Sequence, residues 1–159
     1  MNTSKGFTII ELLIVIAIIA VLASIVLINV NFIRAQSADS KTKAQMAALR
    51  PAAANYYDAP NPNNYGSDIN SADCAAGSTG MAQDTASGFK TLVAPESYSD
   101  GVAPVCTTDA AVAPNNEATK WSAWHSLKAT TNLFCVDSTG AAKEEPSSWT
   151  APTNGDPCP

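Results

Sequence analysis

The stretch that decides the fold of this chain is Phe7-Thr-Ile-Ile-Glu-Leu-Leu-Ile-Val-Ile-Ala-Ile-Ile-Ala-Val-Leu-Ala-Ser-Ile-Val-Leu-Ile28. Nearly every residue in it is apolar, and no glycine or proline interrupts it. At a rise of about 1.5 Å per residue, a helix of this length crosses the hydrocarbon core of a bilayer. Its β-branched residues do not oppose a helix, because lipid offers the backbone no other hydrogen-bond partner. The segment therefore predicts a membrane-spanning helix.

A short polar segment, Met1–Gly6, precedes this helix and carries a positive charge at Lys5. Basic residues beside a span favour the cytoplasmic side of the membrane. An ordinary secretory signal has its small-residue cleavage site after the apolar stretch. Here the plausible cleavage position, after Gly6, lies before that stretch. Cleavage at this point would leave the hydrophobic helix on the mature protein.

Glu11 places a carboxylate inside the apolar run. Such a group is costly in lipid unless it is neutralised or paired, and for this reason it marks a functional position. Glu11 could simply extend to the membrane surface, since it lies near the start of the helix. Alternatively, its carboxylate could pair with the new α-amino group that cleavage creates on Phe7, within one helix or between staggered helices. The residues alone leave these options open.

The run Lys5-Gly-Phe-Thr-Ile-Ile-Glu-Leu12, followed by the apolar stretch, resembles the processing motif of type IV prepilins and of type II secretion pseudopilins. The resemblance implies that a prepilin peptidase cleaves between Gly6 and Phe7 and N-methylates Phe7. It also implies that Glu11 pairs with the Phe7 amine of a neighbouring subunit during filament assembly. Many major pilins carry a glycine and a proline within this helix, whereas this chain has neither between Phe7 and Arg50.

The rest of the chain differs in composition, since all ten prolines lie at or after Pro51. We therefore expect a leader (1–6), a hydrophobic transmembrane and assembly helix (7–33), an amphipathic helix (34–58) and a globular head (59–159). The net charge is −5 and the basic residues are scattered. Because binding to phosphates needs clustered basic residues, this pattern does not indicate a nucleic-acid partner.

The amphipathic helix has an apolar stripe at helical spacing, which is expected to pack on a sheet. The stripe consists of Met46, Leu49, Ala53 and Tyr56. Pro51 lacks an N–H and crowds the preceding turn, so it predicts a bend, while the helical pattern after it argues against a stop. We expect the helix to end by Asp58, because a stretch rich in proline and asparagine follows.

The head shows weaker patterns. A short helix is expected over Ser87–Ala94, and Val102–Thr107 is expected to be an edge strand because it contains Pro104. Lys120–Lys128 and Asn132–Asp137 are predicted to be two strands joined by a turn. Together these elements predict an α+β fold, in which a long helix, half membrane-spanning and half amphipathic, packs on a small antiparallel sheet. This arrangement resembles that of pilins.

Four cysteines, all in the head, carry the remaining strong signal. They are Cys74, Cys106, Cys135 and Cys158. No Cys-x-x-Cys motif occurs, which disfavours a zinc or thioredoxin-like site. An even count behind a membrane segment indicates two disulfides in an oxidising compartment. Of the three possible pairings we favour Cys74 with Cys106 and Cys135 with Cys158, because sequential bridges close two local loops without crossing.

Other residues give no catalytic signal. His125, the single histidine, is interpreted as structural because neither a nucleophile nor a second metal ligand accompanies it. Asp100-Gly101 and Asp137–Gly140 are interpreted as turns, with calcium binding as the weaker alternative. The three tryptophans are expected in the core, with a surface stacking platform as the alternative. They are Trp121, Trp124 and Trp149.

The sequence therefore predicts a structural filament subunit, with no enzymatic activity, no cofactor and no metal. Its expected partners are a prepilin peptidase, identical or related subunits, the inner-membrane assembly machinery and, before assembly, the membrane itself. The head would lie outside the cytoplasm and finally in an extracellular filament serving adhesion, motility or DNA uptake. Two alternatives remain: a pseudopilin of a type II secretion system, and a membrane-anchored extracellular binding module that does not polymerise.

Overall fold

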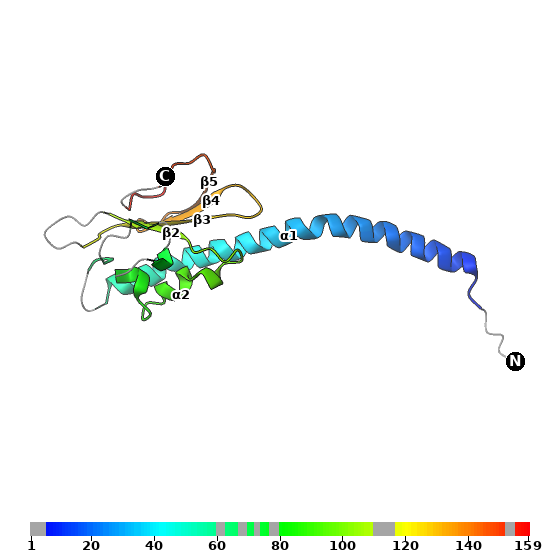
Figure 1. Ribbon diagram of the computed structural model, residues 1–159, viewed down its shortest axis with the longest axis horizontal. Helices are drawn as coiled ribbons and strands as arrows, with labels where there is room; N and C mark the ends of the chain where they lie inside the picture. The colour runs from blue at the N-terminus through cyan, green and yellow to red at the C-terminus, as the bar shows by residue number, and fades with distance from the viewer. Residues whose placement is uncertain are drawn as a thin grey trace.

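The computed structural model describes residues 6–59, 63–66, 70–71, 74–76, 80–109, 117–151 and 155–159. Most of the predicted leader, Met1–Lys5, lies outside these residues. One long helix, α1 (Ile9–Tyr57), forms the spine of the molecule. The head gathers around its C-terminal half, and the N-terminal half projects away from the head (Figure 1). The predicted α+β, pilin-like arrangement of a long helix and a small antiparallel sheet is confirmed.

The head does not cover the described apolar side chains in the projecting half of α1. Every large apolar side chain from Ile9 to Val26 is at least 46% exposed. The helix is long and apolar enough to cross a membrane. It continues through Pro51, as predicted, and ends at Tyr57, where the Asp58 N–H donates to the Ala54 carbonyl at 2.9 Å. A chain that exposes so much apolar surface requires a partner for it, either lipid or protein.

The head-side half of α1 buries the predicted stripe. Met46, Leu49 and Ala53 are buried, and Tyr56 packs partly buried against the same cluster. Their neighbours in the core come from the sheet and from the short helix α2 (Phe89–Val93), which falls within the predicted Ser87–Ala94. Three short 3₁₀ helices complete this side of the head: η1 (Cys74–Ala76), η2 (Gly80–Gln83) and η3 (Pro95–Ser97). The apolar stripe thus packs α1 against the core of the head.

The sheet is an antiparallel meander with the order β1-β2-β3-β4-β5. Its strands are β1 (Asn70–Ser71), β2 (Val105–Thr108), β3 (Trp121–Ser126), β4 (Leu133–Asp137) and β5 (Ala142–Glu145). The predicted hairpin of β3 and β4 is confirmed, with Trp124 opposite Cys135. The edge strand β5 was not predicted, because its Ala-Lys-Glu-Glu sequence is polar and largely exposed.

The prediction that Pro104 makes its strand an edge was wrong. β2 pairs with β1 on one side and with β3 on the other. The strand begins at Val105, one residue after the proline, so the missing N–H lies outside the ladder. The Pro104 carbonyl still contributes, since it accepts from the Cys74 N–H at 2.8 Å.

The tryptophans divide between the two faces of the sheet, which corrects the expectation that all three pack in the core. Trp121 is only 2% exposed and meets Phe89 edge to face at 5.9 Å between ring centroids. Trp124 is half-buried and pairs instead with Trp149, at 6.5 Å between centroids. Residues three apart in a strand point to opposite faces, so Trp121 and Trp124 cannot both face α1.

His125 has a structural setting, as interpreted from the sequence. Its ring stacks on Tyr98 with 4.6 Å between centroids. Its Nδ1 lies 2.7 Å from the Ser126 carbonyl, and its Nε2 lies 3.0 Å from the Val102 carbonyl and 3.5 Å from the Asp100 carboxylate. Burial also raises the pKa of the Tyr98 phenol. The ring thus joins β3 to the loop that follows η3.

Two polar contacts fix α1 against the sheet. The buried Asp39 carboxylate accepts from the backbone N–H groups of Lys128 and Ala129, at 2.6 and 2.8 Å, and so ties the helix to the β3–β4 turn. Lys43 forms an ion pair with Glu144 on β5 at 2.6 Å. This ammonium is the main reason that the pKa of Glu144 is lowered. The helix is therefore joined to the head by directed bonds as well as by its stripe.

The lowered pKa of Glu144 predicts a pH-dependent contribution to stability. Glu144→Gln keeps the hydrogen-bonding shape but removes the charge, so the variant should be slightly less stable than the parent at pH 7. The difference in unfolding free energy between the two proteins should disappear as the pH falls through the pKa of Glu144 in the folded protein, because protonation then removes the same charge from the parent. Urea unfolding of both proteins at pH 7 and pH 3 measures this. A stability difference that does not change with pH would contradict a stabilising ion pair between Lys43 and Glu144.

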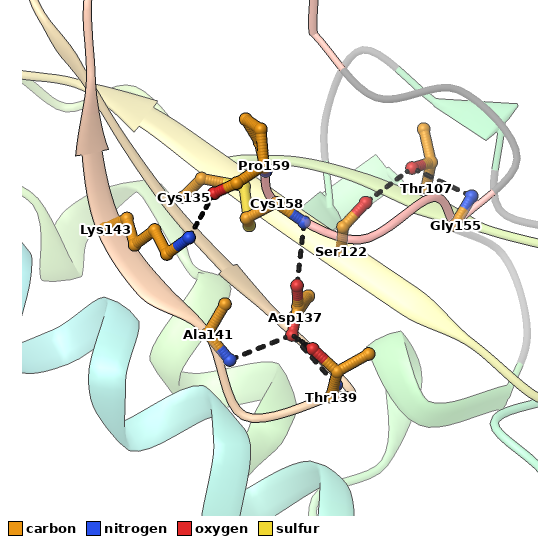
Figure 2. The surroundings of a disulfide bond; sticks show 10 residues. All are labelled: Thr107, Ser122, Cys135, Asp137, Thr139, Ala141, Lys143, Gly155, Cys158 and Pro159. Atoms are coloured by element: carbon orange, nitrogen blue, oxygen red, sulfur yellow. Dashed lines mark hydrogen bonds between the residues drawn. A yellow bond between two sulfur atoms is a disulfide. The ribbon is translucent and has the colours of Figure 1, made fainter.

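Both disulfides lie in the head, in the pairing that the sequence favoured. Cys74 in η1 bonds to Cys106 in β2, and Cys135 in β4 bonds to Cys158. The second bond ties the C-terminal segment to the middle of the sheet (Figure 2). The head is poor in large aliphatic residues, so these bridges contribute stability, on the order of 2–4 kcal/mol each, that a small core cannot supply.

Asp137 organises the same corner of the head. Its carboxylate is 1% exposed and accepts hydrogen bonds from three backbone N–H groups, as Figure 2 shows. Oδ1 accepts from Thr139 at 2.8 Å and from Ala141 at 3.0 Å, closing the β4–β5 turn. Oδ2 accepts from Cys158 at 2.7 Å. The stretch Asp137–Gly140, interpreted above as a turn, is a turn held by its own first side chain.

Asp137→Ala is expected to destabilise the head by about 2–3 kcal/mol, because it leaves the buried Cys158 N–H and two turn N–H groups, of Thr139 and Ala141, without their acceptor. Asp156→Ala is the matched control. It removes the same charge from an exposed position near Cys158 and should change stability by less than about 0.5 kcal/mol. Urea unfolding of the full chain in detergent, followed by tryptophan fluorescence, measures both. Equal stability of the two variants would refute this role for Asp137.

Candidate processing and assembly site

The candidate site lies at the start of α1, far from the head (Figure 1). Gly6, Phe7 and Thr8 precede the helix and are exposed, and the Phe7 side chain is 82% exposed. A Cβ added to Gly6 would meet no atom of the described residues within 4 Å, and Gly6 does not have a positive φ. The fold itself therefore does not require glycine at this position. Any need for glycine here must come from a partner that acts on the chain.

Thr8 and Glu11 form a capping box. The backbone of Thr8 is extended, with φ −85° and ψ 153°, and its hydroxyl oxygen accepts from the Glu11 N–H at 3.3 Å. In return, Glu11 Oε2 accepts from the Thr8 N–H at 2.8 Å and from the Thr8 hydroxyl at 2.9 Å. The first N–H groups of a helix have no partner within it, and a capping box provides partners for two of them. This box therefore fixes the start of α1 at Ile9.

Thr8 is the residue that reasoning from the sequence missed. Its signal was present, because Thr-x-x-Glu before an apolar run is the pattern of a capping box. Glu11 was identified for its charge alone. The structure brings these two residues together and adds a local role for the carboxylate, which lies where the positive end of the helix dipole also favours it.

The capping box also places the Glu11 carboxylate close to the future amine. The two groups that donate hydrogen bonds to the Glu11 carboxylate belong to Thr8, the residue directly after Phe7. In the single uncleaved chain, Glu11 is thus paired with Thr8 rather than unpaired in the apolar run. Pairing of Glu11 with the Phe7 amine of another subunit stays a prediction, since it requires a cleaved chain and a neighbour.

The head has an open hollow on one side. Its volume is about 520 Å³, and it lies between α1 and the β4–β5 turn, with Arg50, Tyr65 and Thr139 among its lining residues. Among the residues described, no group of three or more His, Cys, Asp or Glu side chains is arranged to hold a metal ion. At this hollow the Thr139 hydroxyl donates to the Asp137 carboxylate at 2.8 Å, a bond that belongs to the β4–β5 turn described above.

The comparisons with known proteins point to the same segment. Residues 1–27 match the family described as the prokaryotic N-terminal methylation motif. Neither a curated protein nor a solved structure matched the chain. The matched residues include Gly6, Phe7 and the capping box of Thr8 and Glu11. They also include the first part of the exposed apolar helix, and the small antiparallel sheet follows later in the chain. This motif at the start of α1, followed by this fold, supports a type IV pilin-like or prepilin-like protein.

Proposed function

We propose that the chain is a structural subunit of a type IV pilus-like surface filament, assembled through the N-terminal half of α1 after its leader is removed. The observation that carries this proposal is the combination of a methylation motif with an apolar half-helix that the head leaves uncovered. A plain anchor needs the apolar helix but not the motif. A filament subunit needs both, because cleavage creates the end of the helix that packs among its neighbours.

The proposed sequence of events follows the four parts of the chain. The leader, residues 1–6, holds the N-terminus on the cytoplasmic side while residues 7–33 span the membrane. A prepilin peptidase cuts after Gly6 and methylates the Phe7 amine. The inner-membrane assembly machinery then moves the subunit into the filament. Residues 34–58 connect this helix to the head, residues 59–159.

The head supports the outward placement of the C-terminal part. Two disulfides join η1 and the C-terminal segment to its sheet, and such bonds persist in oxidising compartments and not in the cytoplasm. In the filament the apolar half of α1 exchanges its lipid contacts for the helices of other subunits. Helix packing of this kind depends on close contact and on internal pairing of polar groups, because lipid is as apolar as the side chains.

The experiment is to express the full chain together with a prepilin peptidase and the assembly machinery. Mass spectrometry and N-terminal sequencing should find a mature chain that begins with N-methylated Phe7, and electron microscopy of sheared material should find fibres containing the head. An intact Met1 without fibres would reject the proposal in favour of a membrane-anchored binding module. Fibres that appear only under overexpression, together with a secretion defect when the gene is deleted, would favour a pseudopilin.

A further inference from the structure

We infer that Thr8 is a positioning residue for leader cleavage. Its capping box with Glu11 starts α1 at Ile9 and keeps the Gly6–Phe7 bond in exposed, non-helical chain, where a peptidase can reach it. The inference rests on the proposed function, since it assumes that the leader is cleaved. It goes further by assigning a role to a residue that is neither at the scissile bond nor charged.

The reaction itself needs an accessible carbonyl. Water adds to the Gly6 carbonyl carbon, the bond from that carbon to the Phe7 nitrogen breaks, Gly6 becomes a carboxylate, and Phe7 leaves as an amine that takes up the proton. Inside a helix the Gly6 carbonyl would accept a hydrogen bond from the residue four positions on, and the surrounding turn would shield it. In the structure both Gly6 and Phe7 lie before the helix and are exposed.

The capping box controls where that boundary falls. An N-cap residue has non-helical backbone angles, and the extended Thr8 satisfies this condition. Without an acceptor on the Thr8 side chain, the first turn can fray or the helix can grow toward Gly6. Either change moves the scissile bond relative to the membrane span. A smaller fraction of the precursor would then have the conformation that the peptidase can bind and cleave.

A competing explanation is that the peptidase recognises the shape of Thr8 directly. Substitutions separate the two, because capping and shape depend on different properties of the side chain. Thr8→Val keeps the shape and loses the hydroxyl. Thr8→Asn changes the shape but caps helices at least as well as threonine, and Thr8→Ser also caps.

The test measures cleavage of the full-length precursor by a purified prepilin peptidase in detergent micelles, over a range of precursor concentrations. For Thr8→Val, KM should rise by up to about fivefold, the equilibrium change expected from loss of an N-cap, with kcat nearly unchanged. Thr8→Asn and Thr8→Ser should be cleaved like the parent. Amide hydrogen exchange of the uncleaved chains should show loss of protection at the Glu11 N–H in Thr8→Val alone.

The outcomes are distinct. A Thr8→Val precursor that is cleaved like the parent overturns the inference, and so does a Thr8→Asn precursor that is impaired as much as Thr8→Val. Neither outcome affects the proposed function as long as the parent precursor is cleaved after Gly6. A parent chain that is not cleaved at Gly6 rejects the proposed function, and the inference with it. Unaltered disulfides in every variant confirm that the head is unaffected.

Discussion

Replacing Gly6 with leucine is expected to leave the full-length precursor in the membrane and to abolish filament formation. The substitution adds a branched side chain directly beside the carbonyl that is attacked. Displacement of a reacting group by about 1 Å can cost about 100-fold in rate. Gly6→Ala should be impaired in the same direction. Intact mass of the membrane-extracted chain distinguishes precursor from mature protein.

The structure makes this a test of the peptidase and not of folding. Within the part of the chain that the structure describes, a Cβ at Gly6 meets no atom within 4 Å, and the residue has no positive φ that would strain other amino acids. The variant should therefore show unchanged disulfides and unchanged unfolding of the head. Thr3→Leu provides the matched control, since it adds the same side chain to the leader away from the scissile bond. Normal processing of Gly6→Leu would mean that the methylation motif is not used as a cleavage site.

The parts of the fold that sequence could predict are those with a strong local pattern. The apolar run from Phe7 defines a helix because few alternatives exist in lipid, and the stripe from Met46 to Tyr56 shows which side of α1 meets the head. The hairpin of β3 and β4 follows from two β-rich runs with a short connection. In each of these cases the chain's own residues, without distant partners, determine the structure.

Features that depend on distant partners were missed or misjudged. β5 is polar and becomes a strand only because β4 offers it an edge. β2 lies inside the sheet because the two-residue strand β1 covers its far side, and nothing in the sequence near Pro104 indicates this. Asp39 resembles a surface residue in the helix pattern, yet it is buried because the β3–β4 turn presents two N–H groups to it.

The candidate site was predictable in outline for a different reason. Gly6, Phe7 and Glu11 belong to the methylation motif, so they are visible in the sequence whatever the fold. Thr8 was not predicted, because a Thr-x-x-Glu pattern by itself marks only the start of a helix and not a functional position. Its importance emerged only when the structure showed two-way hydrogen bonding with Glu11.

Glu11→Gln is expected to be cut and to fail in assembly. Glutamine also completes a capping box, so the start of α1 and the cleavage rate should stay close to those of the parent. The variant lacks the negative charge that would pair with the methylated Phe7 amine. A cation left unpaired among apolar helices is strongly unfavourable, so sheared fibres should fall at least about tenfold. Glu96→Gln, at an exposed position of the head, is the control and should assemble normally.

Mixed expression then separates pairing within a subunit from pairing between subunits. If Glu11 pairs with the Phe7 amine of its own chain, every Glu11→Gln chain carries an unpaired cation whatever its neighbours are, and it should be excluded from fibres. If the pair forms between chains, a Glu11→Gln chain can still offer its amine to the Glu11 of a parent neighbour. A minority of variant chains should then enter fibres through their own paired amine, but each leaves the amine of the next chain without a partner, so the mixed fibres should be shorter than parent fibres. Fibres formed by the variant alone would contradict both arrangements and leave Glu11 with the capping role that the structure already shows.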